Sequence, residues 1–192
     1  MDQIVDGRHH GFTLIEVIVT VAMIAILASI AIPSYRHYIV RNAEYEAQSQ
    51  MKQLEIELSR WLSKNLTYKN FQPMKSVTSG GAVTYGYDGT DNNFLYSPKN
   101  SDQNTYRYQI FIVDGSSNKS LIAIDEEGTV DKEGTVDSVT GRSWKMFAIP
   151  NSSLGTAHKL MLSSSGVQCK AKNSDSSVTI ASTNCGTYSE TW

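Results

Sequence analysis

The sequence predicts an α+β protein in which one long N-terminal helix packs on a roughly four-stranded antiparallel sheet. Three observations predict this arrangement. Residues 12–32 are almost wholly apolar, residues 36–65 carry apolar residues at helical spacing, and alternating apolar stretches follow after residue 105. A helical period that gives way to strand signals is typical of α+β folds. The 192 residues, 40% of them hydrophobic, suit one globular domain with an attachment.

The first half of the helix, residues 12–35, is a candidate membrane span. Residues 12–32 read FTLIEVIVTVAMIAILASIAI. As a helix, these 21 residues would be about 31 Å long, enough to cross a hydrocarbon core of about 30 Å. Glu16 is the only ionisable group in the segment. A carboxylate in lipid is costly, so Glu16 needs a partner or a function.

Three interpretations of the apolar segment compete. A secretory signal peptide needs a shorter apolar run with a cleavage site after it, whereas this run continues directly into Pro33 and Tyr35. An ordinary single-pass anchor does not explain Glu16. The third interpretation places cleavage before the apolar run, after Gly11, so that residues 1–11 are a leader peptide that is removed.

Residues 36–65 are predicted to continue the helix as an amphipathic half. Apolar residues recur at spacings of three and four, which predicts one buried stripe. The stripe consists of Ala43, Ala47, Met51, Leu54, Leu58 and Trp61. It could pair with another helix, but such a stripe more often packs on a sheet of its own domain. The two halves together would form one helix of about 80 Å.

Residues 66–104 show no clear period and are predicted to be an irregular connecting region of the kind that often carries function. A few side chains there hint at a calcium loop. They are Asp88, Asp91, Asn92 and Asn93. Because they lack the spacing and the terminal glutamate of an EF-hand, no metal site is predicted.

Residues 105–192 are expected to form the antiparallel sheet and a C-terminal disulfide loop. Strands are predicted at residues 106–113, 121–124, 144–149 and 160–162. Between the second and third of these, EGTVD at residues 127–131 recurs at residues 133–137. Two copies are too few for a solenoid, so the repeat is interpreted as a duplicated loop tip.

Two cysteines, Cys169 and Cys185, lie close together near the C-terminus. In an oxidising compartment an isolated pair usually forms one disulfide. Such a bond would remove roughly 3 kcal/mol of unfolded-state entropy. Two free thiols in a cytosolic protein are the alternative. A zinc site is not expected, because no second cysteine pair or paired histidines lie nearby.

The sequence offers no catalytic set, and we expect neither an enzyme nor a cofactor. There is no P-loop, GxGxxG or HExxH motif, and His158 lacks a GxSxG setting. The net charge is −2, and without residues 1–11 the chain keeps 16 basic against 17 acidic residues. Direct nucleic-acid binding therefore has no support in the composition. Tyrosines between residues 68 and 108 could stack on bases, but without basic companions we interpret them as strand and loop residues.

The motif GFTLIE at residues 11–16 resembles the processing site of type IV prepilins and of the related type II secretion pseudopilins. The resemblance implies the pilin fold. It also implies that prepilin peptidase cuts after Gly11 and N-methylates Phe12. In the filament, the family pairs the carboxylate corresponding to Glu16 with the N-terminal ammonium of a neighbouring subunit. An unpaired Glu16 that reaches to the membrane interface is the alternative.

The resemblance extends along the apolar stretch to Pro33 and Tyr35. In related pili the helix loosens near this point on assembly, so Pro33 would mark a hinge. A simple proline kink is the alternative. Counting lysine and arginine in residues 1–11 against those just after the span does not support a cytoplasmic N-terminus. That orientation rests on the resemblance.

The C-terminal half, with SWKMFAIP at 143–150 and SSGVQC at 164–169, resembles minor pilins close to the major pilin. We therefore expect a minor type IV pilus subunit with roles in adhesion, twitching motility or DNA uptake. It would sit in the bacterial inner membrane with its head in the periplasm. The assembly machinery would then join it to other pilins in a pilus at the cell surface. A type II secretion pseudopilin is the alternative, and a pilus-tip adhesin or DNA-binding module is an alternative of another class.

Overall fold

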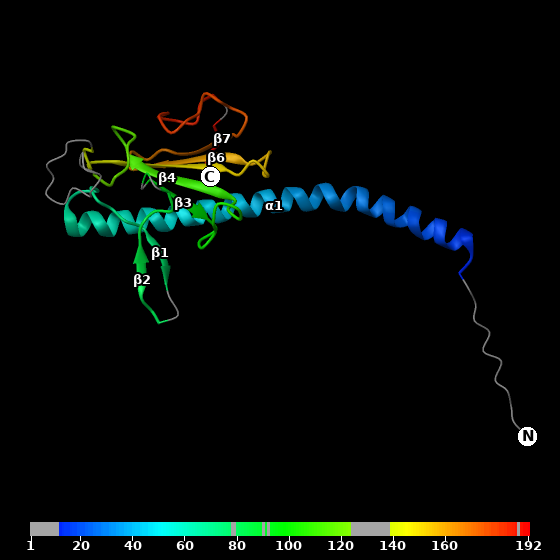
Figure 1. The fold of residues 1–192 in the computed structure, drawn as a ribbon. Helices are drawn as coiled ribbons and strands as arrows, with labels where there is room; N and C mark the ends of the chain where they lie inside the picture. The colour runs from blue at the N-terminus through cyan, green and yellow to red at the C-terminus, as the bar shows by residue number, and fades with distance from the viewer. Residues whose placement is uncertain (1–11, 78–79, 90, 92, 124–138, 188) are drawn as a thin grey trace, which may run out of the picture. The chain divides into compact units, whose positions relative to one another are not determined.

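The computed structural model describes residues 12–77, 80–89, 91, 93–123, 139–187 and 189–192. One helix, α1, is followed by seven strands, β1 to β7 (Figure 1). The chain divides into two compact units, one ending at Ile39 and one comprising Val40–Trp192. The predicted leader with Gly11, residue Asn92 and both copies of the EGTVD repeat lie outside the described residues.

Helix α1 spans Leu14–Asn65, 52 residues, and confirms the prediction of one continuous helix. At its start the hydroxyl of Thr13 accepts a hydrogen bond of 3.3 Å from the Glu16 N–H. At its end Leu66 takes a left-handed conformation with φ of 58°, and its N–H donates to the Leu62 carbonyl at 2.8 Å. Both ends therefore carry ordinary helix caps, which satisfy backbone groups that would otherwise lack partners.

The main sheet has five antiparallel strands in the order β3-β4-β5-β6-β7. Its strands are β3 Phe94–Ser97, β4 Tyr108–Asp114, β5 Trp144–Pro150, β6 His158–Ser163 and β7 Gln168–Lys172. A separate two-stranded sheet pairs β1 Met74–Val77 with β2 Val83–Tyr85. Within the second unit, α1 runs along the five-stranded sheet, and the β1–β2 hairpin lies on the opposite side of the helix (Figure 1).

The predicted helix stripe forms the centre of the core. Its members from Ala43 to Leu58 are at most 1% exposed, whereas Trp61 is half-buried. Alternate sheet residues such as Tyr108, Ile110 and Leu160 are fully buried. Every second strand residue and the helix residues spaced near 3.6 apart thus pack against each other in one apolar layer.

The other face of the sheet has its own small core under the C-terminal segment. Phe147 of β5, Met161 of β6 and Cys169 of β7 are register neighbours across three strands. They pack in a cluster with Val178 and Cys185 from the segment after β7. The C-terminal disulfide loop therefore covers an apolar sheet face that would otherwise meet water.

The strand predictions need three corrections. Residues 66–104 hold β1, β2 and β3, where an irregular connection was expected, and β3 brings the sheet to five strands. Residues 121–123 are a buried bend instead of a strand, next to an isolated bridge between Val113 and Ser120. Strand β7 was not predicted. Each of these segments is short, so its alternation is too brief to separate strand from coil.

Both edges of the five-stranded sheet are capped. At β3, the Phe94 carbonyl accepts from the Asp88 N–H at 2.9 Å, and the Tyr96 N–H donates to the Asp88 carboxylate at 2.8 Å. At β7, Lys170 and Glu190 exchange two backbone hydrogen bonds of 2.7 and 3.1 Å. Unpaired strand edges invite pairing with other chains. These caps therefore reduce the chance that the sheet itself recruits a second subunit.

Candidate assembly surface

The first unit is an apolar helix without a covering. From Phe12 to Tyr38 nearly every side chain is exposed, and Phe12 itself is 81% exposed. An 18-residue window of α1 has a mean hydropathy of 2.6, so the helix is long and apolar enough to cross a membrane. So large an exposed apolar surface requires lipid or other protein around it.

Glu16 lies in the first turn of this helix, three residues after the capping residue Thr13. A threonine followed three residues later by a glutamate is a capping-box pattern, and the TLIE sequence carried that signal. The cap uses the backbone N–H of Glu16. Within the described residues, the Glu16 carboxylate itself forms no hydrogen bond within 3.5 Å and no ion pair within 4.0 Å. The carboxylate is therefore free to interact with another molecule.

Pro33 lies inside the helix, which continues through it. Proline has no N–H, so the Ser29 carbonyl lacks its usual helical donor. The Ser29 hydroxyl turns away to the Ile26 carbonyl at 2.7 Å. This turn therefore has one main-chain hydrogen bond fewer than its neighbours, which is the local weakness that the hinge interpretation requires.

The disulfide between Cys169 and Cys185 is present, and it fastens the C-terminal loop to β7. Two lysines hold the same loop. Lys145 Nζ donates to the Ser182 carbonyl at 3.0 Å, and Lys159 Nζ donates to two loop carbonyls at 2.6 and 3.0 Å. Lys145 is 5% exposed, and this desolvation lowers its pKa. The sequence did not identify these lysines, because their carbonyl partners lie in a segment without regular structure.

Asp88, one of the residues considered for metal binding, has other partners. The Asp88 carboxylate binds Lys75 Nζ at 2.7 Å in addition to the Tyr96 N–H. Among the residues that the structure describes, no three His, Cys, Asp or Glu side chains come together in a metal-binding group. Asp88 therefore has a structural task at the sheet edge.

His158 is also engaged structurally. Its Nδ1 lies 2.8 Å from a carboxylate oxygen of Glu44, which also accepts the His158 backbone N–H at 2.9 Å. The Tyr108 hydroxyl donates to the His158 carbonyl at 2.8 Å. Burial, and the nearby Glu44, raise the pKa of Tyr108, so its hydroxyl stays a neutral donor. These contacts join α1, β4 and β6.

Comparisons with known proteins agree with the N-terminal motif. A family model described as the prokaryotic N-terminal methylation motif matches residues 6–32. The type IV major pilin protein PilA of Myxococcus xanthus is 35% identical over 80 residues, 42% of this chain and 36% of PilA. A probable minor fimbrial protein of Dichelobacter nodosus is 36% identical over 60 residues, 31% of this chain and 38% of that protein.

Major fimbrial proteins FimA of Dichelobacter nodosus are also similar, one of them 50% identical over 44 residues, which are 23% of this chain and 28% of that FimA. The chain thus spans about a third of the length of the curated relatives it matches. No solved structure matches it significantly.

An exposed apolar helix with a methylation motif, followed by an α+β head, gives the chain a pilin-like fold whose helix is long and apolar enough to cross a membrane. The chain is thus similar to type IV pilins at its N-terminal segment, and the proteins it resembles include major subunits and a probable minor one.

Proposed function

We propose that this chain is a minor structural subunit of a type IV pilus. Prepilin peptidase cleaves it between Gly11 and Phe12 and N-methylates Phe12, and the subunit then assembles through its N-terminal helix. The observation that carries the proposal is the exposed apolar helix with one unpaired carboxylate, inside a matched methylation motif.

The carboxylate of Glu16 would set the axial position of the helix in the filament. A charged side chain near the centre of a membrane helix costs about 2.5–3.5 kcal/mol, and less toward the interface. The N-terminal ammonium of a neighbouring subunit would offset this cost and fix the axial register. The Thr13 cap supports this role, because it satisfies the backbone at this turn and leaves the carboxylate available.

The proposed location before assembly is the bacterial inner membrane, with the head in the periplasm. The disulfide between Cys169 and Cys185 supports an exported head, because the periplasm is oxidising and the cytosol is not. After assembly the subunit lies in a pilus at the cell surface. There it contributes to adhesion, twitching motility or DNA uptake. Its partners are the prepilin peptidase, other pilins and the inner-membrane assembly machinery.

Minor status rests on the likeness of the C-terminal half to minor pilins, and a probable minor fimbrial protein is among the similar proteins. Quantitative mass spectrometry of sheared pili measures the subunit ratio. A chain that makes up most of the filament would contradict the minor assignment.

Intact-mass analysis of wild type and Glu16→Gln tests processing and assembly together. We expect both proteins to begin at N-methylated Phe12, and only wild type to enter the sheared pilus fraction efficiently. Glu46→Gln is the matched control, because it makes the same change at an exposed position of the head half of α1. A mature chain that keeps residues 1–11 would refute the processing step. Glu16→Gln in pili at the wild-type level would refute the pairing.

Type II secretion pseudopilins have the same N-terminal motif, so a separate test must distinguish a pilus subunit from a pseudopilus subunit. Deleting the gene should remove or reduce surface pili and leave protein secretion intact. Lost secretion with normal pili would instead assign the chain to a secretion pseudopilus.

A further inference from the structure

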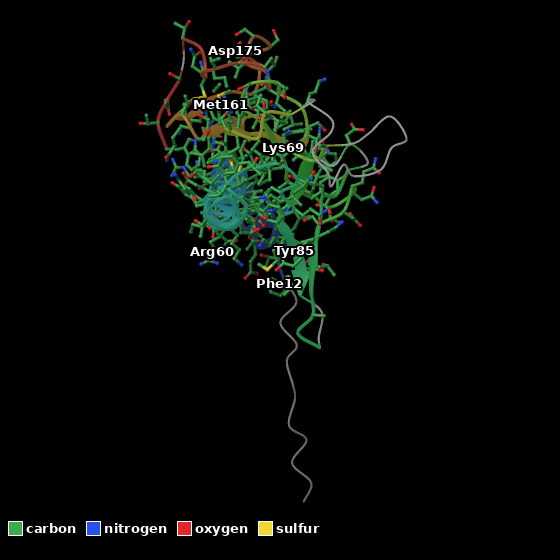
Figure 2. All side chains as sticks on the ribbon, turned by 90° about the vertical axis from the view of Figure 1, so that its left-hand side faces the viewer. Phe12, Arg60, Lys69, Tyr85, Met161 and Asp175 are labelled. Atoms are coloured by element: carbon green, nitrogen blue, oxygen red, sulfur yellow. A yellow bond between two sulfur atoms is a disulfide. The ribbon has the colours of Figure 1, made fainter. Side chains whose placement is uncertain are left out.

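A groove of about 650 Å³ lies between the last turns of α1 and the β1–β2 hairpin, within the second unit. Two cations, two amides and two aromatic rings contribute to its lining. They are Arg60, Lys64, Asn65, Gln72, Trp61 and Tyr85. Figure 2 shows Arg60 and Tyr85 on the side of α1 away from Met161 and the five-stranded sheet. The volume is within the range of small-ligand sites in proteins.

The floor of the groove is held by internal contacts. Trp61 Nε1 donates to the Lys69 carbonyl at 3.2 Å, and its ring meets Phe71 edge-on with centroids 5.9 Å apart. The Glu57 carboxylate accepts the Met74 N–H at 3.0 Å, which ties the start of β1 to the helix. Because these walls are already fixed, a ligand would bind without ordering them first.

The charge of the groove is positive. Arg60 and Lys64 are one helical turn apart, and both are exposed. Neither has an ion-pair partner within 4.0 Å in the described part of the chain. Glu57 is the only acidic residue among the described lining residues, and one of its oxygens is already bonded to Met74. A guanidinium and an ammonium side by side favour a carboxylate or another small anion.

The other side chains that line the groove favour a ligand with an apolar face and hydrogen-bonding groups as well as a negative charge. Tyr85 is 62% exposed at the end of β2, so its ring offers a flat apolar face to a ligand. Gln72 is exposed, and its amide can donate and accept hydrogen bonds; the Asn65 NH₂ already donates to the Trp61 carbonyl at 3.1 Å, which leaves its second N–H and its oxygen for a ligand. A carboxylated sugar ring has all three matching features, namely an anion, an apolar C–H face and hydroxyls that both donate and accept. A peptide would also bring main-chain groups that need partners, and side chains dominate this lining.

We propose that this groove binds an acidic saccharide. The sugar carboxylate pairs with Arg60 and Lys64, the ring stacks on Tyr85, and hydroxyls bond to Gln72 and Asn65. The inference concerns the head of the protein and does not depend on pilus assembly.

Calorimetric titration of the full-length protein, in a detergent without a sugar headgroup, tests the proposal. The probe is a galacturonic acid trisaccharide, and its fully methyl-esterified form is the uncharged control. We expect the acid to bind and the ester to bind roughly tenfold more weakly or not at all. Arg60→Gln and Tyr85→Ala should each weaken binding of the acid by roughly tenfold.

Arg107→Gln is the protein control, because it removes the same charge from an exposed arginine just before β4, whose one acidic neighbour, Glu46, lies 3.9 Å away. It should bind the acid as wild type does. The proposal is overturned by absent binding, by equal binding of acid and ester, or by equal losses in Arg60→Gln and Arg107→Gln. A glutamate tripeptide that binds as tightly and with the same variant sensitivity would overturn it in favour of an acidic protein partner.

Discussion

Asp114 is the side chain whose replacement should damage the head most clearly. It is fully buried at the end of β4, and its carboxylate accepts four hydrogen bonds. One oxygen accepts from the Thr140 hydroxyl at 2.9 Å and from the Gly141 N–H at 3.0 Å. The other accepts from the N–H groups of Ser116 and Ser117 at 3.1 and 2.8 Å. This one carboxylate therefore binds residues at both ends of the segment that connects β4 to β5.

The magnitude follows from the donors that would be left without an acceptor. In Asp114→Asn the amide NH₂ replaces one oxygen and faces two donors instead of accepting from them. A buried donor without a partner costs about 1–3 kcal/mol. The hydroxyl of Thr140 can rotate to another acceptor, but backbone N–H groups cannot. We therefore expect a loss of about 3 kcal/mol, equivalent to a melting temperature lowered by roughly 6–12 °C.

The same carboxylate predicts a pH dependence. Burial alone would raise the pKa of Asp114, but the bonds from Ser117, Thr140 and Gly141 outweigh it and hold the pKa below its usual value. A depressed folded pKa means that the stabilisation is present above the unfolded value of about 3.9 and is lost as the pH falls through the folded pKa. Below that range Asp114→Asn should approach wild type in stability.

Thermal unfolding of the full-length protein in detergent, followed by near-UV circular dichroism, measures both effects. Asp102→Asn is the matched control, because the Asp102 carboxylate also accepts three hydrogen bonds but lies in an exposed turn. Water can replace those bonds, so the control should melt near wild type. Equal losses in both variants, or no loss in Asp114→Asn at neutral pH, would refute this role of the Asp114 carboxylate.

Three further predictions follow from burial and from the sheet edges. Asp88→Ala should uncover the β3 edge and produce higher oligomers in light scattering, whereas Lys75→Ala, which leaves the Asp88 bond to the Tyr96 N–H in place, should not. Replacing Cys169 and Cys185 together by serine should cost roughly 3 kcal/mol in chemical unfolding, and reduction of wild type should match it. Met51→Ala, at 0% exposure, should cost about 2–5 kcal/mol in the same assay.

The sequence predicted best where one signal extends over many residues. The apolar run and the stripe after it are long, so their period alone identified α1 and most of its buried face. The motif at the start of α1 also contained the Thr13 cap, which the capping-box pattern would have revealed. A helix cap between near neighbours and a long repeat of apolar residues can both be identified from the sequence without knowing the fold.

Short strands and long-range bonds could not be predicted in this way. Strand β3 has four residues, and it is a strand because β4 lies beside it in register. The apolar run at 121–124 was predicted as a strand, but its described residues 121–123 form a bend whose backbone bonds to Asn70. The tasks of Asp88 and Asp114 depend equally on partners that only the folded chain brings near.

The structure of the head bears on how a filament would grow. A pilin with an open sheet edge could add subunits by strand pairing, and the apolar helix would then serve only as an anchor. Here Asp88 and Gln50 occupy the free groups of β3, with Gln50 Nε2 donating to the Tyr96 carbonyl at 3.1 Å. The segment at Glu190 pairs with β7 at the other edge. With both edges capped, the proposed assembly would use the exposed apolar helix before Val40, and Glu16, which has no partner among the described residues, would be a group on it that can set a register.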